Sequence, residues 1–68
     1  MTSTEEPVLR LDALKPGDRV QVWGPRGVDA TGTVEQSAPH LNVVWIREDI
    51  LGERVMIDLQ EAGLRAGP

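Results

Sequence analysis

The chain has 68 residues, with seven Lys and Arg against eleven Asp and Glu, a formal net charge of −4 at pH 7, and no cysteine. A chain of this length supports one domain with one thin core. The lack of cysteine excludes a disulfide framework, a thiolate zinc site and a cysteine nucleophile. No basic-apolar leader and no run of 18 apolar residues is present, so we expect a cytoplasmic protein without a membrane segment.

The domain is predicted to run over residues 8–65, between a flexible acidic tail at 1–7 and a frayed C-terminus at 66–68. Its first element is a weakly alternating edge strand at 8–11. A single turn at 12–15 follows and is ended by a proline, which disfavours the helical conformation of the residue before it.

Alternating apolar residues predict the remaining strands. These are expected over residues 19–23, 30–36, 42–47, 53–57 and 64–65. Glycine- and proline-rich or charged segments predict connecting loops over 24–29, 37–40 and 48–52. Asp58 as an N-cap and Gly63 as a C-terminal glycine predict one helical turn over 58–63, before the last strand.

The alternation also assigns faces. Inward positions are expected at Val20, Val22, Gly32 and Val34, and Val55 and Ile57 share one face of their strand. Periodicity does not assign the faces of the continuous apolar run at 43–46; if Val44 and Ile46 point inward, Val43 and Trp45 point outward. Gly32 is explained either by a close backbone approach or by a bulge that curls the sheet. The order of strands, loops and one helical turn predicts an all-β fold, a small SH3-like five-stranded barrel. No helix long enough for a ubiquitin-like fold or an OB-fold is expected.

The stretch Gly17-Asp18-x-Val20-x-Val22, followed by Gly32-x-Val34, resembles the KOW motif of SH3-like domains in ribosomal proteins and transcription elongation factors. The resemblance covers about a quarter of the chain and implies a barrel fold. It also implies RNA contacts from a loop that in the family carries lysine and glycines. Here the loop carries Arg26, Val28 and Asp29 instead, so the family's basic contact set is not reproduced.

The sequence gives little support for a catalytic or metal-binding site. His40 is the only histidine, and Glu48, Asp49 and Glu53 do not follow the spacing of an EF-hand. A carboxyl group that acts as a general acid needs a pKa raised by burial in a pocket, and a chain of this length is too short to form a deep pocket. We therefore expect no enzyme activity, no cofactor, no metal and no small-molecule substrate. Two tryptophans without Phe or Tyr also make a poor cage for a methylated lysine or arginine.

The function expected is that of a non-catalytic protein-interaction or accessory module. Its contact residues are predicted on one outer side of adjacent strands, with a second contact at the hairpin tip, since exposed tryptophan and arginine are enriched in binding sites. The predicted set is Trp23, Trp45, Met56, Arg19, Arg47 and Arg54, with Ile50 and Leu51 at the tip. A register slip of one residue would reverse these faces and bury the tryptophans.

The partner is expected to be another protein or a second copy of the chain. The alternative is a KOW-like nucleic-acid or ribonucleoprotein module in which arginines touch phosphates, namely Arg19, Arg26, Arg47 and Arg54. The acidic balance and the scattered arginines disfavour it, because nucleic-acid-binding domains usually present a clustered basic face. A weaker third possibility is an acidic decoy or inhibitor.

Overall fold

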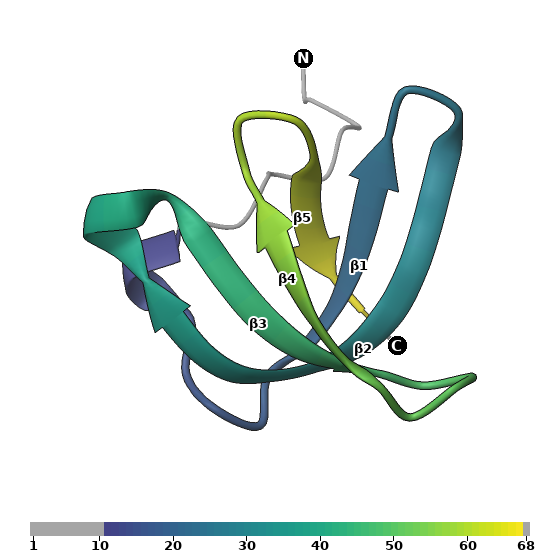
Figure 1. Cartoon of the computed structure of the whole chain (residues 1–68), viewed down its shortest axis with the longest axis horizontal. Coiled ribbons are helices and arrows are strands. Elements are labelled where there is room, and N and C mark those ends of the chain that lie inside the picture. Colours follow the sequence, from purple (N-terminus) through teal and green to yellow (C-terminus); the bar gives the residue numbers. More distant parts are fainter. Residues whose placement is uncertain (1–10, 68) are drawn as a thin grey trace, which may run out of the picture.

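A computed structural model describes residues 11–67 of the chain. Five antiparallel strands form one sheet in the order β4-β3-β2-β1-β5 (Figure 1). The strands are β1 (Arg19–Gly24), β2 (Gly27–Ala38), β3 (Val43–Glu48), β4 (Arg54–Asp58) and β5 (Gly63–Ala66). Two short 3-10 helices, η1 (Leu11–Ala13) and η2 (Pro39–Leu41), complete the described elements.

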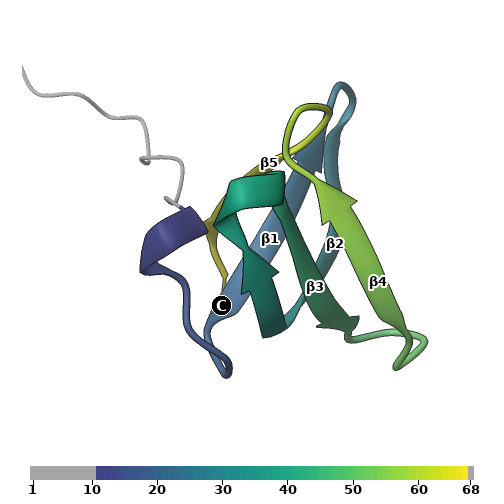
Figure 2. The same cartoon turned by 60° about the vertical axis from the view of Figure 1, so that its left-hand side comes forward.

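The 12-residue strand β2 is shared between two pairings. Its first half pairs with β1, and β3 pairs with it only from Gly32 onward. The sheet therefore curves along β2, with β1 and β5 on one side and β3 and β4 on the other (Figures 1 and 2). Two register shifts in β2, at Asp29 and at Glu35, add to the bend, because a bulge increases the local twist.

The all-β, five-stranded prediction is confirmed, whereas closure into a barrel is not. The edge strands β4 and β5 stand at opposite ends of the sheet order and are not hydrogen-bonded to each other, so the sheet is open. The turn expected over 58–63 is a hydrogen-bonded turn and not a helix. In it the backbone amides of Glu61 and Ala62 donate to the Asp58 carbonyl at 3.0 and 3.2 Å.

Several predicted boundaries are wrong for local reasons. Leu11 begins η1 rather than ending a strand, and residues 8–10, like the predicted tail at 1–7, lie outside the described residues. The loop expected over 24–29 is a tight turn, because Gly27 at φ +118° reverses the chain and pairs with Gly24. Within residues 11–67, no helix has the length and apolar character needed to span a membrane.

The core confirms the inward faces predicted for β1 and β2, and it decides the inward face of β3. Its fully buried members are Val20, Val22, Val34, Val44, Ile46 and Leu64. Val55 and Ile57 of β4 point the same way but are only half-buried, although they pack against this core. Edge position alone does not explain the difference, because Leu64 on the other edge strand, β5, is fully buried.

Gly32 lies where the two halves of β2 meet. It pairs with Val20 on one side and with Glu48 on the other, and a Cβ added there would run into the carbonyl oxygen of Arg47. The same Cβ would lie 3.2 Å from the Glu48 Cα. Of the two explanations offered by the sequence, the close backbone approach is the one observed, since the bulges lie on either side of Gly32.

We expect Gly32→Ala to destabilise the fold by about 2 kcal/mol, because strand β3 would have to move away from β2. Gly63→Ala is the matched control, since nothing lies within 4 Å of a Cβ at that strand position; its effect should stay within about 0.5 kcal/mol. Urea unfolding of both variants measures the difference. Equal midpoints for Gly32→Ala and the wild type would contradict the close approach.

Candidate functional site

Three side chains form a row across the outer side of β2, β3 and β4. Trp45 pairs with Gln36 on one side and with Met56 on the other. Trp45 is half-buried, whereas Met56 is 55% exposed. The Arg54 guanidinium lies over the Trp45 ring, 5.7 Å from its centroid, within the range of a cation–π contact.

Two arginines border this row and share one carboxylate. Arg47 and Arg54 are cross-strand partners on β3 and β4. The Arg47 Nε donates to Glu35 Oε2 at 2.9 Å, and the Arg54 Nη1 donates to Glu35 Oε1 at 3.2 Å. Arg54 also donates to the Gln36 side chain at 3.0 Å. The two guanidinium groups are thereby held at fixed positions beside the tryptophan.

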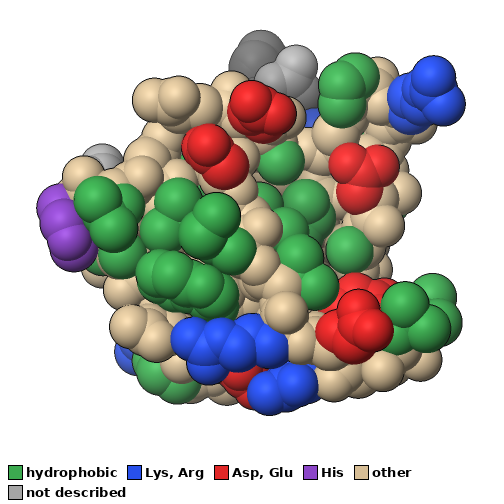
Figure 3. Space-filling view, in the orientation of Figure 1, with side chains coloured by type: hydrophobic (Ala, Val, Ile, Leu, Met, Phe, Trp, Pro, Cys, Tyr) green, Lys and Arg blue, Asp and Glu red, His purple; other side chains and the backbone are tan. Residues whose placement is uncertain are grey.

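We call this surface the β3–β4 face and define it by Glu35, Gln36, Trp45, Arg47, Arg54 and Met56. Figure 3 shows hydrophobic side chains gathered over β3 and β4, with Lys and Arg side chains directly beside them. The alternation does not predict the position of Glu35, because Glu35 is the extra residue of a bulge and has no backbone pairing partner on β3. The bulge brings its carboxylate to both arginines.

Trp23 does not belong to this face, which corrects the expectation of one continuous patch. It lies on β1 and pairs with Val28 and Gly63. Along β2, its partner Val28 and the Trp45 partner Gln36 are separated by a contour of about 26 Å. The two tryptophans therefore mark different ends of the sheet.

The Trp23 ring is covered within the domain. The Arg65 guanidinium lies 4.1 Å from the ring centroid, and the indole Nε1 donates to Gln21 Oε1 at 3.2 Å. Stacking under an arginine shields the ring from solvent and satisfies its polar atom. Trp23 is thus half-buried by its own neighbours on β1 and β5.

Arg19 is also separate from the β3–β4 face. It forms a bidentate pair with Asp49, at 2.9 and 2.6 Å, and donates to the Thr33 hydroxyl at 2.8 Å. This contact ties β1 to the start of the β3–β4 hairpin. Ile50 and Leu51, at the hairpin tip, are 87% and 72% exposed, and the Glu48 carboxylate accepts hydrogen bonds from both of their backbone amides.

No group of three or more His, Asp or Glu side chains within residues 11–67 is arranged to hold a metal ion. Comparison of the chain with protein-family models, with curated proteins and with solved structures finds no match.

The Arg19–Asp49 pair predicts an acid-sensitive contact. The hydrogen bonds from Arg19 hold the pKa of Asp49 below its usual 3.8. A carboxyl whose pKa is lower in the folded state stabilises the fold fully above its unfolded pKa, and this contribution is lost as pH falls through the folded pKa.

We expect the thermal unfolding midpoint of the wild type to lie above that of Asp49→Asn at pH values above the usual carboxyl pKa. The two midpoints should converge in stronger acid. Glu61→Gln, which alters an exposed carboxyl outside this pair, should follow the wild type at every pH. Parallel midpoints for wild type and Asp49→Asn over the whole range would show that the pair adds no pH-dependent stability.

The stacking of Arg65 on Trp23 predicts a fluorescence response. In a Trp45→Phe background only Trp23 emits, and Arg65→Ser should make that emission more sensitive to acrylamide because the ring loses its cover. Arg54→Ser in the same background should leave the quenching unchanged, since Arg54 lies over the other tryptophan. Unchanged quenching in Arg65→Ser would show that the arginine does not shield Trp23.

Proposed function

We propose that this protein is a non-catalytic, SH3-like small β domain that binds a protein partner through the β3–β4 face. The strand order β4-β3-β2-β1-β5 and the long, bent second strand support the SH3-like part of the proposal. The arrangement of side chains on β3 and β4 supports the binding part.

The observation that carries the proposal is the exposed Met56 beside the half-buried Trp45. Interface centres are enriched in tryptophan, methionine and arginine, and such anchors contribute most of the binding energy when a partner removes them from water. Trp45 is already oriented by Arg54. Binding would therefore order few additional side chains, which lowers the entropic cost of association.

The charges of the face suggest the partner's chemistry. Arg47 and Arg54 share the single carboxylate of Glu35, so the face carries one more positive than negative charge on a chain whose formal charge is −4. A partner that offers an apolar side chain to Met56 and Trp45 and a carboxylate to the arginines would complement it.

Nucleic-acid binding is less well supported as an activity of this face. A nucleic acid is bound largely by Lys and Arg side chains that neutralise its phosphates and release its counterions. Arg19, Arg47 and Arg54 each already face a carboxylate of this chain. Arg26 is exposed in the β1–β2 turn, away from the arginines of β3 and β4. The single excess positive charge of the β3–β4 face is less than the clustered basic surface that nucleic-acid-binding domains usually present.

The experiment is an affinity capture from the native cell with three forms of the chain, followed by measurement of the dissociation constant for the captured protein. The forms are wild type, Met56→Glu and Gln60→Glu. Both variants add one negative charge at an exposed position, but Gln60 lies in the β4–β5 turn, outside the β3–β4 face. We expect Met56→Glu to weaken binding at least about tenfold and Gln60→Glu to leave it unchanged.

Retention of the partner by Met56→Glu at wild-type affinity would contradict the proposed face. Loss of capture after nuclease treatment, with a steep dependence on salt, would replace the protein partner by a nucleic acid. Sedimentation of the wild type at rising concentration detects the remaining version, in which the same face joins two copies of the chain. In that version Met56→Glu should abolish the concentration dependence.

A further inference from the structure

The first half of β2 has a neighbouring strand on one side only. Residues 27–31 pair with β1, while β3 begins to pair only at Gly32. The last contact before β3 turns away is the hydrogen bond from the Asp49 amide to the Thr31 carbonyl, at 3.0 Å. Beyond it, the other edge of β2 faces no strand within the described residues. Unpaired strand edges of this kind accept an extended segment from another chain.

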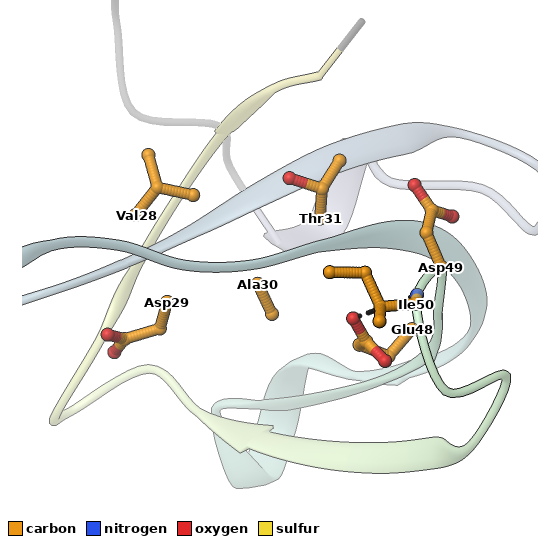
Figure 4. A pocket seen from close by; sticks show the side chains of 7 residues that line it. All are labelled: Val28, Asp29, Ala30, Thr31, Glu48, Asp49 and Ile50. Atoms are coloured by element: carbon orange, nitrogen blue, oxygen red, sulfur yellow. Dashed lines mark hydrogen bonds between the residues drawn. The ribbon is translucent and has the colours of Figure 1, made fainter.

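A groove runs beside this edge. Its volume is about 250 Å³, and its walls come from β2 and from the start of the β3–β4 hairpin (Figure 4). We call it the β2-edge groove and define it by its lining residues, Val28, Asp29, Ala30, Thr31, Glu48, Asp49 and Ile50. It shares no residue with the β3–β4 face.

The bulge in β2 determines what faces the groove. Val22 pairs with Ala30 and Trp23 pairs with Val28, so Asp29 is the extra residue. Figure 4 shows Asp29 and Ala30, although consecutive, on the same side of the strand, with the Ile50 side chain directed toward Ala30. The Asp29 carboxylate lies over Gly24 of β1, where a Cβ on that glycine would meet it, and it lines the end of the groove away from Ile50.

The groove combines apolar walls with negative charge. Ile50 and Val28 are 87% and 47% exposed, which leaves apolar surface for a partner to cover. Asp29 and Glu48 are both acidic, and neither forms an ion pair within residues 11–67. The charge of Asp49, in contrast, is matched by Arg19. The Glu48 oxygens accept hydrogen bonds from the Ile50 and Leu51 amides, but neither carboxylate has a cationic partner within residues 11–67. Beside an apolar hollow, the two negative charges complement a cation next to an apolar side chain.

We propose that the β2-edge groove binds an extended segment of a partner protein in which Lys or Arg flanks an apolar residue. The apolar side chain enters between Ala30 and Ile50, the flanking cations approach Asp29 and Glu48, and the segment's backbone follows the unpaired edge of β2. Affinity comes from the covered apolar area, and the carboxylates give the preference for a basic segment.

A second copy of the chain fits the groove poorly. The chain carries only seven Lys and Arg against eleven acidic residues. Within the described residues, Arg19, Arg47 and Arg54 are paired with carboxylates and Arg65 covers Trp23. Among these residues this leaves Lys15 and Arg26, which lie in the connection before β1 and in the β1–β2 turn and not in an extended segment. A basic segment from a different protein complements the charge better.

The test uses the full chain and two synthetic heptapeptides, Lys-Val-Lys-Val-Lys-Val-Lys and its counterpart with Glu in place of Lys. Backbone amide signals are followed by NMR during titration. We expect the basic peptide to bind with a dissociation constant of about 1 mM or tighter. The shifted amides should belong to residues 28–31 and 48–50, with the effect reduced at high salt. The acidic peptide should produce no shifts there.

Two variants separate charge from apolar contact. Asp29→Asn should weaken binding of the basic peptide about threefold, and Ile50→Ser should weaken it by a similar factor. Both positions are exposed, and the amide spectra of the variants report whether the fold is retained. Met56→Ser is the control, since it lies on the β3–β4 face, adds no charge and should bind the basic peptide as the wild type does.

Equal binding of the two peptides, shifts confined to the β3–β4 face, or no shifts at millimolar peptide would each overturn the proposal. So would shifts of the groove amides with protein concentration alone, because a second copy would then occupy the groove. Since the Met56→Glu capture experiment concerns a different surface, failure of one proposal leaves the other standing.

Discussion

The fold depends on the pairing of β2 with two neighbouring strands. The strand pairs with β1 through its first half and with β3 through its second, and Gly32 stands where both pairings overlap. A side chain there would meet the backbone of β3, so the absence of a Cβ is what lets the second half of the sheet join the first. The core of valine, isoleucine and leucine forms inside the resulting curve.

The same constraint produces both candidate binding surfaces. Strand β2 has one register shift in its pairing with β1 and one in its pairing with β3. Each bulge places an acidic residue on a side of the strand that simple alternation of side chains does not predict. Glu35 reaches the arginines of the β3–β4 face, and Asp29 lines the β2-edge groove with its carboxylate over Gly24 of β1. Because β3 pairs with β2 only from Gly32 onward, the first half of β2 also keeps an unpaired edge beside that groove.

Electrostatic pairing then separates the two surfaces by charge. Glu35 matches part of the charge of Arg47 and Arg54, which leaves the β3–β4 face with excess positive charge, whereas the β2-edge groove keeps the carboxylates of Asp29 and Glu48. Exposed ion pairs of this kind add little stability, but they orient the side chains that a partner would meet. The two proposed surfaces therefore differ in the sign of their charge.

The all-β class and the inward face of β1 could be predicted from the sequence, because Val20 and Val22 alternate with polar or outward residues as in a strand with one buried face. The faces of β3 could not, because Val43, Val44, Trp45 and Ile46 form a continuous apolar run. The sequence alone could not show that Trp23 and Trp45 lie at different ends of the sheet. Nor could it show that a carboxylate joins Arg47 to Arg54 or that the sheet stays open. These features depend on register and on bulges, which come from pairing with distant strands and leave no trace in local periodicity.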